Sequence, residues 1–311
     1  MARETPCTLT GRPKIVESFD GTHTLSPAPA PPRKDEGPAR GKYNMPPVDV
    51  PLQRLRFGQT RRRDTWWVQP LVTFVVFSSF VAYTTWALFQ GEYYHYGNYL
   101  SPFYSPELFG DSPHSIFGPW RWPWLPLVRF SPAMLILVFP LAFRMTCYYY
   151  RGAYYKAFWA DPPACAVGEP RSGYRGEQKL PLIVQNLHRY ALYFALVFVV
   201  ILAHDAWKGF WFNDPATGHD KFGIGIGSLV LLTNVILIAG YTFGCHSLRH
   251  LVGGVFDQMS RHPARKRAYD CVSCLNRAHP RWAWFSLFGV GLTDVYVRLC
   301  AMGVITDWRI I

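Results

Sequence analysis

Residues 231–250 read LLTNVILIAGYTFGCHSLRH, an apolar run that ends in a cluster of polar side chains. Together with the apolar residues before it, the run has roughly the 20 residues needed to cross the hydrocarbon core of a bilayer. Its end carries one thiol, two imidazoles and one guanidinium, on Cys245, His246, His250 and Arg249. The stretch therefore predicts a membrane-spanning helix whose end presents side chains that could bind a metal or a polar ligand.

Four further apolar stretches of similar length lie along the chain of 311 residues, half of which are hydrophobic. The charged residues are concentrated between these stretches, which is typical of a membrane protein. We expect an all-α integral membrane protein in which residues 64–311 form a five-transmembrane-helix bundle. The expected helices lie near residues 66–89, 127–146, 188–206, 224–246 and 283–305. Pro132 and Pro140 interrupt the second stretch, so a kinked helix is expected there.

Residues 1–63 differ in character from the rest of the chain. They contain APAPPRKDEGPARGKYNMPPVDVP, show almost no apolar periodicity and end in Arg61, Arg62 and Arg63. This composition predicts a disordered Pro/Arg-rich arm. The arm lacks the apolar region and cleavage site of a secretory signal, so we expect the N-terminus to stay in the cytoplasm.

The distribution of Lys and Arg predicts the orientation of the bundle. The arm carries 12 of these residues, and the connections 144–189 and 247–281 carry 7 each, whereas 90–129 and 205–222 carry 2 each. The positive-inside rule then predicts a multi-pass protein of the cytoplasmic (inner) membrane, with the arm and the two basic connections in the cytoplasm. The formal net charge of +12 is explained by topology and lipid attraction, without a nucleic-acid partner.

The same topology brings five chain segments with Cys or His residues to the cytoplasmic face. These residues are Cys147, Cys165, His188, the group Cys245, His246 and His250, and His279. The histidine pair is spaced by one helical turn, so both imidazoles can reach one metal. The alternatives remain open: a free Cys often behaves as a small buried hydrophobe, and a His near a helix end can interact with the helix dipole.

Asp294 and Arg298 lie one turn apart in the outward half of the last expected helix, within GLTDVYVR. Ionisable residues at that depth are costly and seldom face lipid. The pair is therefore interpreted as a proton path or as a structural ion pair of the bundle.

Five strings in the chain resemble a known family. They are GNYLSPFYSPELF (97–109), TCYYYRGAYYKAFWADPPACAV (146–167), QNLHRYALYF (185–194), GCHSLRHLVGG (244–254) and LTDVYVR (292–298). They resemble the membrane-anchor subunit of succinate dehydrogenase, respiratory complex II, and more narrowly its single-polypeptide actinobacterial type. The resemblance covers about residues 60–311 and leaves the arm uncovered.

This resemblance implies a subunit that binds no succinate itself. It would dock a flavoprotein subunit and an iron–sulfur subunit on the cytoplasmic face and pass electrons to menaquinone or ubiquinone in the membrane, in a complex that could form a higher oligomer. It also implies a Rieske-type [2Fe–2S] cluster, in which two imidazoles replace two thiolates on one iron. We expect Cys147, Cys165, His246 and His250 as its ligands, with His188 and Cys245 as close competitors.

A quinone-binding site is expected near the same membrane interface, because a quinone needs hydrogen-bond donors for two carbonyl oxygens and an apolar cleft for its tail. The candidate residues are Tyr149, Arg151, His188, Arg189 and Trp284. His188 combines reach with a pKa that suits proton delivery near neutral pH.

Three other interpretations remain. The first is a b-type cytochrome anchor with one haem held by His188 and either His246 or His250. The second is a membrane di-iron oxygenase, which HSLRH superficially resembles, although such enzymes need several His boxes and this chain has one. The third is a structural scaffold whose Cys and His residues are satisfied core groups.

Overall fold

The computed structural model describes residues 55–119, 131, 133–170, 178–180, 182–213, 218–254 and 257–311. Residues 1–54, which include most of the predicted arm, lie outside this description. The described residues belong to one compact unit, Leu55–Ile311.

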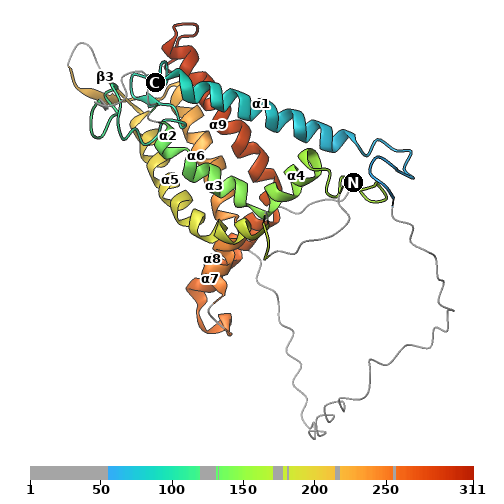
Figure 1. The fold of residues 1–311 in the computed structure, drawn as a ribbon. Coiled ribbons are helices and arrows are strands. Elements are labelled where there is room, and N and C mark those ends of the chain that lie inside the picture. The colour runs from blue at the N-terminus through green and yellow to red at the C-terminus, as the bar shows by residue number, and fades with distance from the viewer. Residues whose placement is uncertain are drawn as a thin grey trace, which may run out of the picture. The chain divides into compact units, whose positions relative to one another are not determined.

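The unit is built from helices, four of which are long: α1 (Val68–Gln90), α5 (His188–Lys208), α6 (Ile226–Phe243) and α9 (His279–Ala301). Figure 1 shows α5, α6 and α9 together with α3 (Val138–Thr146) in one bundle. Many large apolar side chains of α1 and α5 are exposed, among them Val75 and Val200. This exposure suits helices that face lipid, where no water opposes it.

Long apolar helices confirm the predicted fold class. Within the described residues, three helices are long and apolar enough to span a membrane, Val68–Gln90, Leu182–Lys208 and Ile226–Phe243, and a bent pair could make a fourth. The range Leu182–Lys208 includes the 3-10 helix η1 (Leu182–Leu187) that leads into α5. Helix α9 has 23 residues at the place of the fifth expected helix, but Arg281, Asp294 and Arg298 lower its apolar character.

The second expected span differs from the prediction in shape. It consists of α2 (Ala133–Ile136), α3 and α4 (Tyr148–Phe158), with a bend of 80° between α3 and α4. The bend falls at Cys147, whose backbone is extended (φ −63°, ψ 128°) and whose N–H bonds the carbonyl of Arg144. Pro140 lies inside α3, so the sharp turn comes seven residues later than the proline; residues 127–130 and Pro132 lie outside the described residues.

The two ends of the bundle differ. At one end lie three elements after α6: α7 (His246–Gly253), the 3-10 helix η2 (Met259–Arg261) and α8 (Pro263–Arg277). At the other end lie two antiparallel strand pairs: β1 (His95–Tyr96) with β2 (Tyr99–Leu100), and β3 (Trp211–Asn213) with β4 (Asp220–Phe222). We refer to these as the α7/α8 end and the strand end (Figure 1).

Helix α9 packs along α6, and small residues make this close approach possible. A Cβ atom added at Gly240 would lie 2.5 Å from the indole ring of Trp282, far inside van der Waals contact. The glycine thus lets the two helices meet near the α7/α8 end. In the same way, a Cβ at Gly227 would lie 2.4 Å from the ring of Tyr99, at the strand end.

The last residues assigned to the arm have a defined place. Thr60 pairs with Val167 in an antiparallel bridge, and Gly168 donates its N–H to the carbonyl of Gln59 at 2.8 Å. Residues 55–61 therefore lie against the loop that follows α4.

Candidate functional site

Two thiols and two imidazoles from four separate parts of the chain line one cavity of about 600 Å³ at the α7/α8 end. Cys147 lies at the bend between α3 and α4, and His188 begins α5. Cys245 lies between α6 and α7, and His279 begins α9. All four residues are at most 9% exposed.

The four side chains form two mixed pairs. Cys147 Sγ lies 3.6 Å from His279 Nε2, and Cys245 Sγ lies 3.0 Å from His188 Nε2. The other ring nitrogen of His188 lies 2.9 Å from the hydroxyl of Thr146, which fixes the ring. By contrast, Nδ1 of His279 is buried and has no hydrogen-bond partner in the described part of the chain. Buried imidazole nitrogens are normally paired, so this atom is a notable exception.

Aromatic rings hold both imidazoles in place from the bundle side. The ring of Phe143 stacks on His188 with centroids 4.7 Å apart, and Tyr241 stacks on His279 at 5.0 Å. Both aromatic residues are almost fully buried. The imidazole planes are therefore fixed by packing as well as by hydrogen bonds.

The antiparallel course of the helices explains why these four residues meet. Helix α3 ends and α5 begins at the α7/α8 end, and α6 ends and α9 begins there too (Figure 1). Each of the four residues stands at one of those helix ends. Residues that are distant in sequence thus converge because each connection returns to the same end.

The cavity contains thiol and imidazole side chains, the types of ligand that a Rieske-type iron–sulfur cluster uses. Across the described ranges, no three His, Cys, Asp or Glu side chains form a group that could hold one metal. A Rieske cluster takes two Cys on one iron and two His on the other, so each iron takes only two protein ligands. The close contacts in this cavity instead join one Cys to one His. The lining of this cavity contains two Cys and three His, of which Cys147, Cys245, His188 and His279 are the buried ones.

Of the ligands predicted from sequence, the structure places only part at this cavity. Cys147 and His246 line it, and so do both competitors, His188 and Cys245. His250 is exposed, and its Nε2 lies 3.0 Å from Nε2 of His246. Cys165 is exposed in the loop after α4, where its carbonyl accepts a bond from Arg62.

Sequence reasoning left His279 out of the ligand set. Its signal was its position, since it directly precedes the last apolar stretch on the same side as the other candidates.

Burial, and then the nearby charges of His250 and Arg249, lower the pKa of His246 below its ordinary value.

The predicted quinone residues fall into two groups. Tyr149, Arg151 and His188 line the cavity that holds the thiols, and Trp284 donates a hydrogen bond of 2.7 Å to the Tyr149 hydroxyl. Arg189 lies outside this lining, with its guanidinium over the ring of Tyr190.

Asp294 and Arg298 form an ion pair at 2.8 Å in the interior, with side chains 0% and 3% exposed. Asp294 also accepts hydrogen bonds from Tyr83 and Ser101, and Arg298 donates to the carbonyls of Glu92 and Ala87. Protein groups thus surround both charges, as a structural ion pair requires.

The apolar helices and the buried Cys and His side chains define a helical membrane protein with a candidate redox site. Residues 68–303 match the family described as actinobacterial succinate dehydrogenase subunit SdhC. The chain belongs to this family of succinate dehydrogenase membrane anchors.

A solved structure is also similar. It is a chain of the "Mycobacterium smegmatis Sdh1 complex in the apo form", with 42% sequence identity and a TM-score of 0.73. The match covers 84% of this chain and 97% of that chain. No curated protein matches the sequence.

Proposed function

We propose that this chain anchors a succinate:quinone oxidoreductase in the cytoplasmic membrane and relays electrons to membrane quinone through a Rieske-type [2Fe–2S] cluster. The observation that carries the proposal is the buried cavity lined by Cys147, Cys245, His188 and His279. These four residues replace the sequence-based set as the proposed ligands.

Each proposed ligand has a physical role. Cys147 and Cys245 would supply thiolates, and His188 and His279 would supply imidazoles, which raise the potential of such a cluster relative to four thiolates. A raised potential suits electron delivery to a quinone. Thr146 orients His188 through the bond to its outer ring nitrogen, as outer hydrogen bonds commonly do for histidine ligands.

The partner subunits follow from the family and from charge. A flavoprotein subunit and an iron–sulfur subunit would oxidise succinate and dock at the α7/α8 end, with the arm and the basic connections on that cytoplasmic side. Residues 144–189 and 247–281 carry 7 Lys and Arg each, which favours this orientation. The electron acceptor would be menaquinone or ubiquinone.

The test uses the purified complex that contains this chain, with Cys147→Ser, Cys245→Ser and Cys165→Ser compared side by side. We expect the first two variants to lose the Rieske-type electron paramagnetic resonance signal, because serine does not replace a thiolate on iron. Quinone reduction should fall by more than the roughly 10–100-fold that loss of an outer hydrogen-bond partner costs. Succinate oxidation with a water-soluble dye should persist, since it depends on the partner subunits.

Cys165→Ser is the matched control, because the sequence alone ranks Cys165 with Cys147 and the structure places it on the surface. It should keep both the signal and the activity. Full iron content and quinone reduction in Cys147→Ser and Cys245→Ser would contradict the proposed cluster. A haem b absorption band without a Rieske signal would favour the one-haem anchor instead.

A further inference from the structure

The histidine pair of α7, His246 and His250, lies outside the four proposed cluster ligands. Both imidazoles are exposed, and α7 lies beside α8 beyond the ends of the long helices (Figure 1). Their Nε2 atoms are 3.0 Å apart, and the two rings meet edge to face with centroids 4.5 Å apart. Ring nitrogens that commonly bind metals therefore lie next to each other on one side of a short exposed helix.

The separation of the two Nε2 atoms is close to that of two nitrogens on one zinc ion. Zn–N bonds of about 2.0–2.1 Å at a tetrahedral angle place the two nitrogens about 3.3 Å apart. A small rotation of either exposed side chain is enough to widen the observed 3.0 Å to that value. The i, i+4 spacing is also the one at which two histidines on a helix face bind zinc.

Both Nε2 atoms must offer a lone pair to a metal. In the hydrogen-bonded pair, one Nε2 carries a proton and donates it to the other. That proton can move to Nδ1 of its own ring by exchange with solvent, because the ring is exposed. The change of tautomer frees both Nε2 lone pairs, and neither imidazole gains or loses a proton.

The cation that lies between the two histidines in sequence is held by another helix. Arg249 Nε donates to Ser273 Oγ at 3.1 Å, and its guanidinium lies 5.1 Å from the centre of the Tyr269 ring. Both of these partners belong to α8 (Pro263–Arg277). The guanidinium is therefore fixed against α8 and does not occupy the histidine face of α7.

The pair would bind an ion with two protein ligands and with water. Among the described residues, no third Cys, His, Asp or Glu joins the two histidines in a group that could hold a metal. Structural zinc sites have four protein ligands, whereas sites with open positions keep exchangeable ligands. A site of two imidazoles thus suits an ion that binds and leaves, and the fold does not depend on it.

His246 connects this pair to the cavity of the four proposed ligands. Its side chain lines that cavity, whereas His250 lies outside the lining. His246 also directly follows Cys245 in the chain. An ion on the pair would therefore lie at the edge of the proposed cluster site, and its two positive charges would stabilise an electron added there.

We propose that His246 and His250 bind one Zn²⁺ ion at the edge of this cavity and that the bound ion slows electron transfer to quinone. The zinc site stands on the geometry of the pair alone, and the effect on electron transfer rests on the proposed function. A dication beside the cluster raises its reduction potential, because the reduced form is the more negative one. Onward transfer to quinone then becomes less favourable.

The first experiment measures zinc binding to the purified complex by titration with ZnCl2. Zinc suits imidazole ligands and has no redox chemistry of its own that would disturb the cluster signal. His250→Gln should lose one bound zinc per copy of this chain, or bind it at least about tenfold more weakly, because one of two ligands is gone. His262→Gln is the matched control, because it removes another exposed histidine at the same end, and it should bind zinc as before.

A second variant tests the spacing instead of the number of histidines. Leu251 is 44% exposed and follows His250 on α7. Leu251→His in the His250→Gln background restores the histidine count, but it places the imidazole about 100° away around the helix. Zinc binding should stay lost. Full recovery of binding in this double variant would overturn a site built on i, i+4 geometry.

The third experiment measures the effect on electron transfer in the same complex. Saturating Zn²⁺ should lower quinone reduction and move the midpoint potential of the Rieske signal to a more positive value. Dye-linked succinate oxidation should be unchanged, since it depends on the partner subunits. In His250→Gln, the same zinc concentration should change neither quinone reduction nor the midpoint potential.

The outcomes distinguish the zinc site from the cluster. Equal zinc binding by His250→Gln and the unsubstituted complex overturns the zinc site and leaves the cluster standing. Loss of the Rieske signal in zinc-free His250→Gln would make His250 a cluster ligand and would also overturn it. Zinc bound by the pair in a complex without a Rieske signal supports the zinc site and contradicts the proposed cluster. Zinc bound without slower quinone reduction overturns the effect on electron transfer.

Discussion

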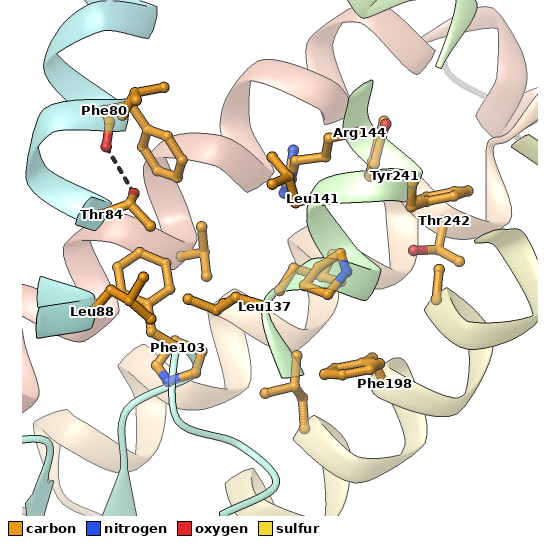
Figure 2. A pocket seen from close by; sticks show the side chains of 18 of the residues that line it. Phe80, Thr84, Leu88, Phe103, Leu137, Leu141, Arg144, Phe198, Tyr241 and Thr242 are labelled. Atoms are coloured by element: carbon orange, nitrogen blue, oxygen red, sulfur yellow. Dashed lines mark hydrogen bonds between the residues drawn. The ribbon is translucent and has the colours of Figure 1, made fainter. Parts of the chain in front are cut away.

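Both ends of the bundle contain buried ionisable groups, but the partners of these groups differ between the two ends. At the strand end, Arg298 has a carboxylate 2.8 Å away and carbonyl oxygens around it. At the other end, Arg144 lines a cavity between α1 and α3 (Figure 2), and its hydrogen-bond acceptors among the described residues are hydroxyl and carbonyl oxygens. Both arginines lie in helices of the bundle, Arg144 in α3 and Arg298 in α9, and an unpaired charge inside a membrane protein is costly.

This difference teaches how to read buried polar groups in a membrane bundle. A closed network, such as the one around Asp294, satisfies its charges with protein groups, so that removing one partner leaves an uncompensated buried charge. An open one, such as Arg144 with the neighbouring Cys and His side chains, retains capacity for a ligand. Nδ1 of His279, which is buried and has no hydrogen-bond partner among the described residues, belongs to the open end as well.

The largest expected effect tests the closed end. Asp294→Asn leaves Arg298 buried without a counter-charge, and breaking such a pair costs about 3–5 kcal/mol. The control is Asp270→Asn, since Lys266 and Asp270 form a pair at the same 2.8 Å and the same i, i+4 spacing but on an exposed helix face. Exposed helix pairs contribute only about 0.3–0.5 kcal/mol. Thermal unfolding of the complex measures both; equal shifts would remove the distinction between the two ends.

A smaller effect tests the helix packing beside the open end. Gly240→Ala forces a methyl group against the ring of Trp282 and should destabilise the protein by about 1–3 kcal/mol, as overpacking does. Gly152→Ala is the opposite case, because it lies in α4 with no atom within 4 Å of the added Cβ. Alanine should stabilise that helix by about 0.5–1 kcal/mol. The unfolding midpoints should therefore move in opposite directions, and a Gly240→Ala protein as stable as the original would show that Trp282 can move aside.

The smallest effect concerns pH at the open end. The pKa of His246 is lowered by burial first and then by the charge on His250, so protonation of His246 opposes folding. Its contribution to stability is present above its ordinary pKa of 6.5 and is lost as the pH falls below that value. In His250→Gln, the pKa of His246 should rise partway toward 6.5, because burial remains. Nuclear magnetic resonance titration of labelled histidines measures this, and a further drop would contradict the assigned repulsion.

Much of the fold followed from the sequence. Runs of apolar residues located the long helices to within a few residues, because length and hydrophobicity are local properties. For example, the sequence predicts a helix near residues 188–206, and α5 spans His188–Lys208. The sharp bend at Cys147 and the short helices α7 and α8 were missed, since their patterns resemble those of ordinary connections.

The site was only partly predictable. Sequence spacing favoured His246 with His250 because residues one turn apart must lie on one helix face, and the structure brings their Nε2 atoms to 3.0 Å. Spacing carries no information on how four separate helix ends meet. Cys147 and His246, two of the expected ligands, line the cavity, and their role as ligands stays a prediction. The sequence did not show that Cys165 is exposed or that His279 lines the cavity, because the direction of each connection is not a local property.

The sequence by itself determined that this chain is a helical membrane protein of the succinate dehydrogenase anchor family. The length of an apolar stretch and a short sequence motif are both local properties of the sequence. Only the tertiary structure decided which thiols and imidazoles share a cavity and which buried arginine has no carboxylate partner in the described part of the chain. Those properties depend on the packing of α3, α5, α6 and α9 against one another, because this packing brings a side chain at the end of each helix close to a side chain at the end of another helix.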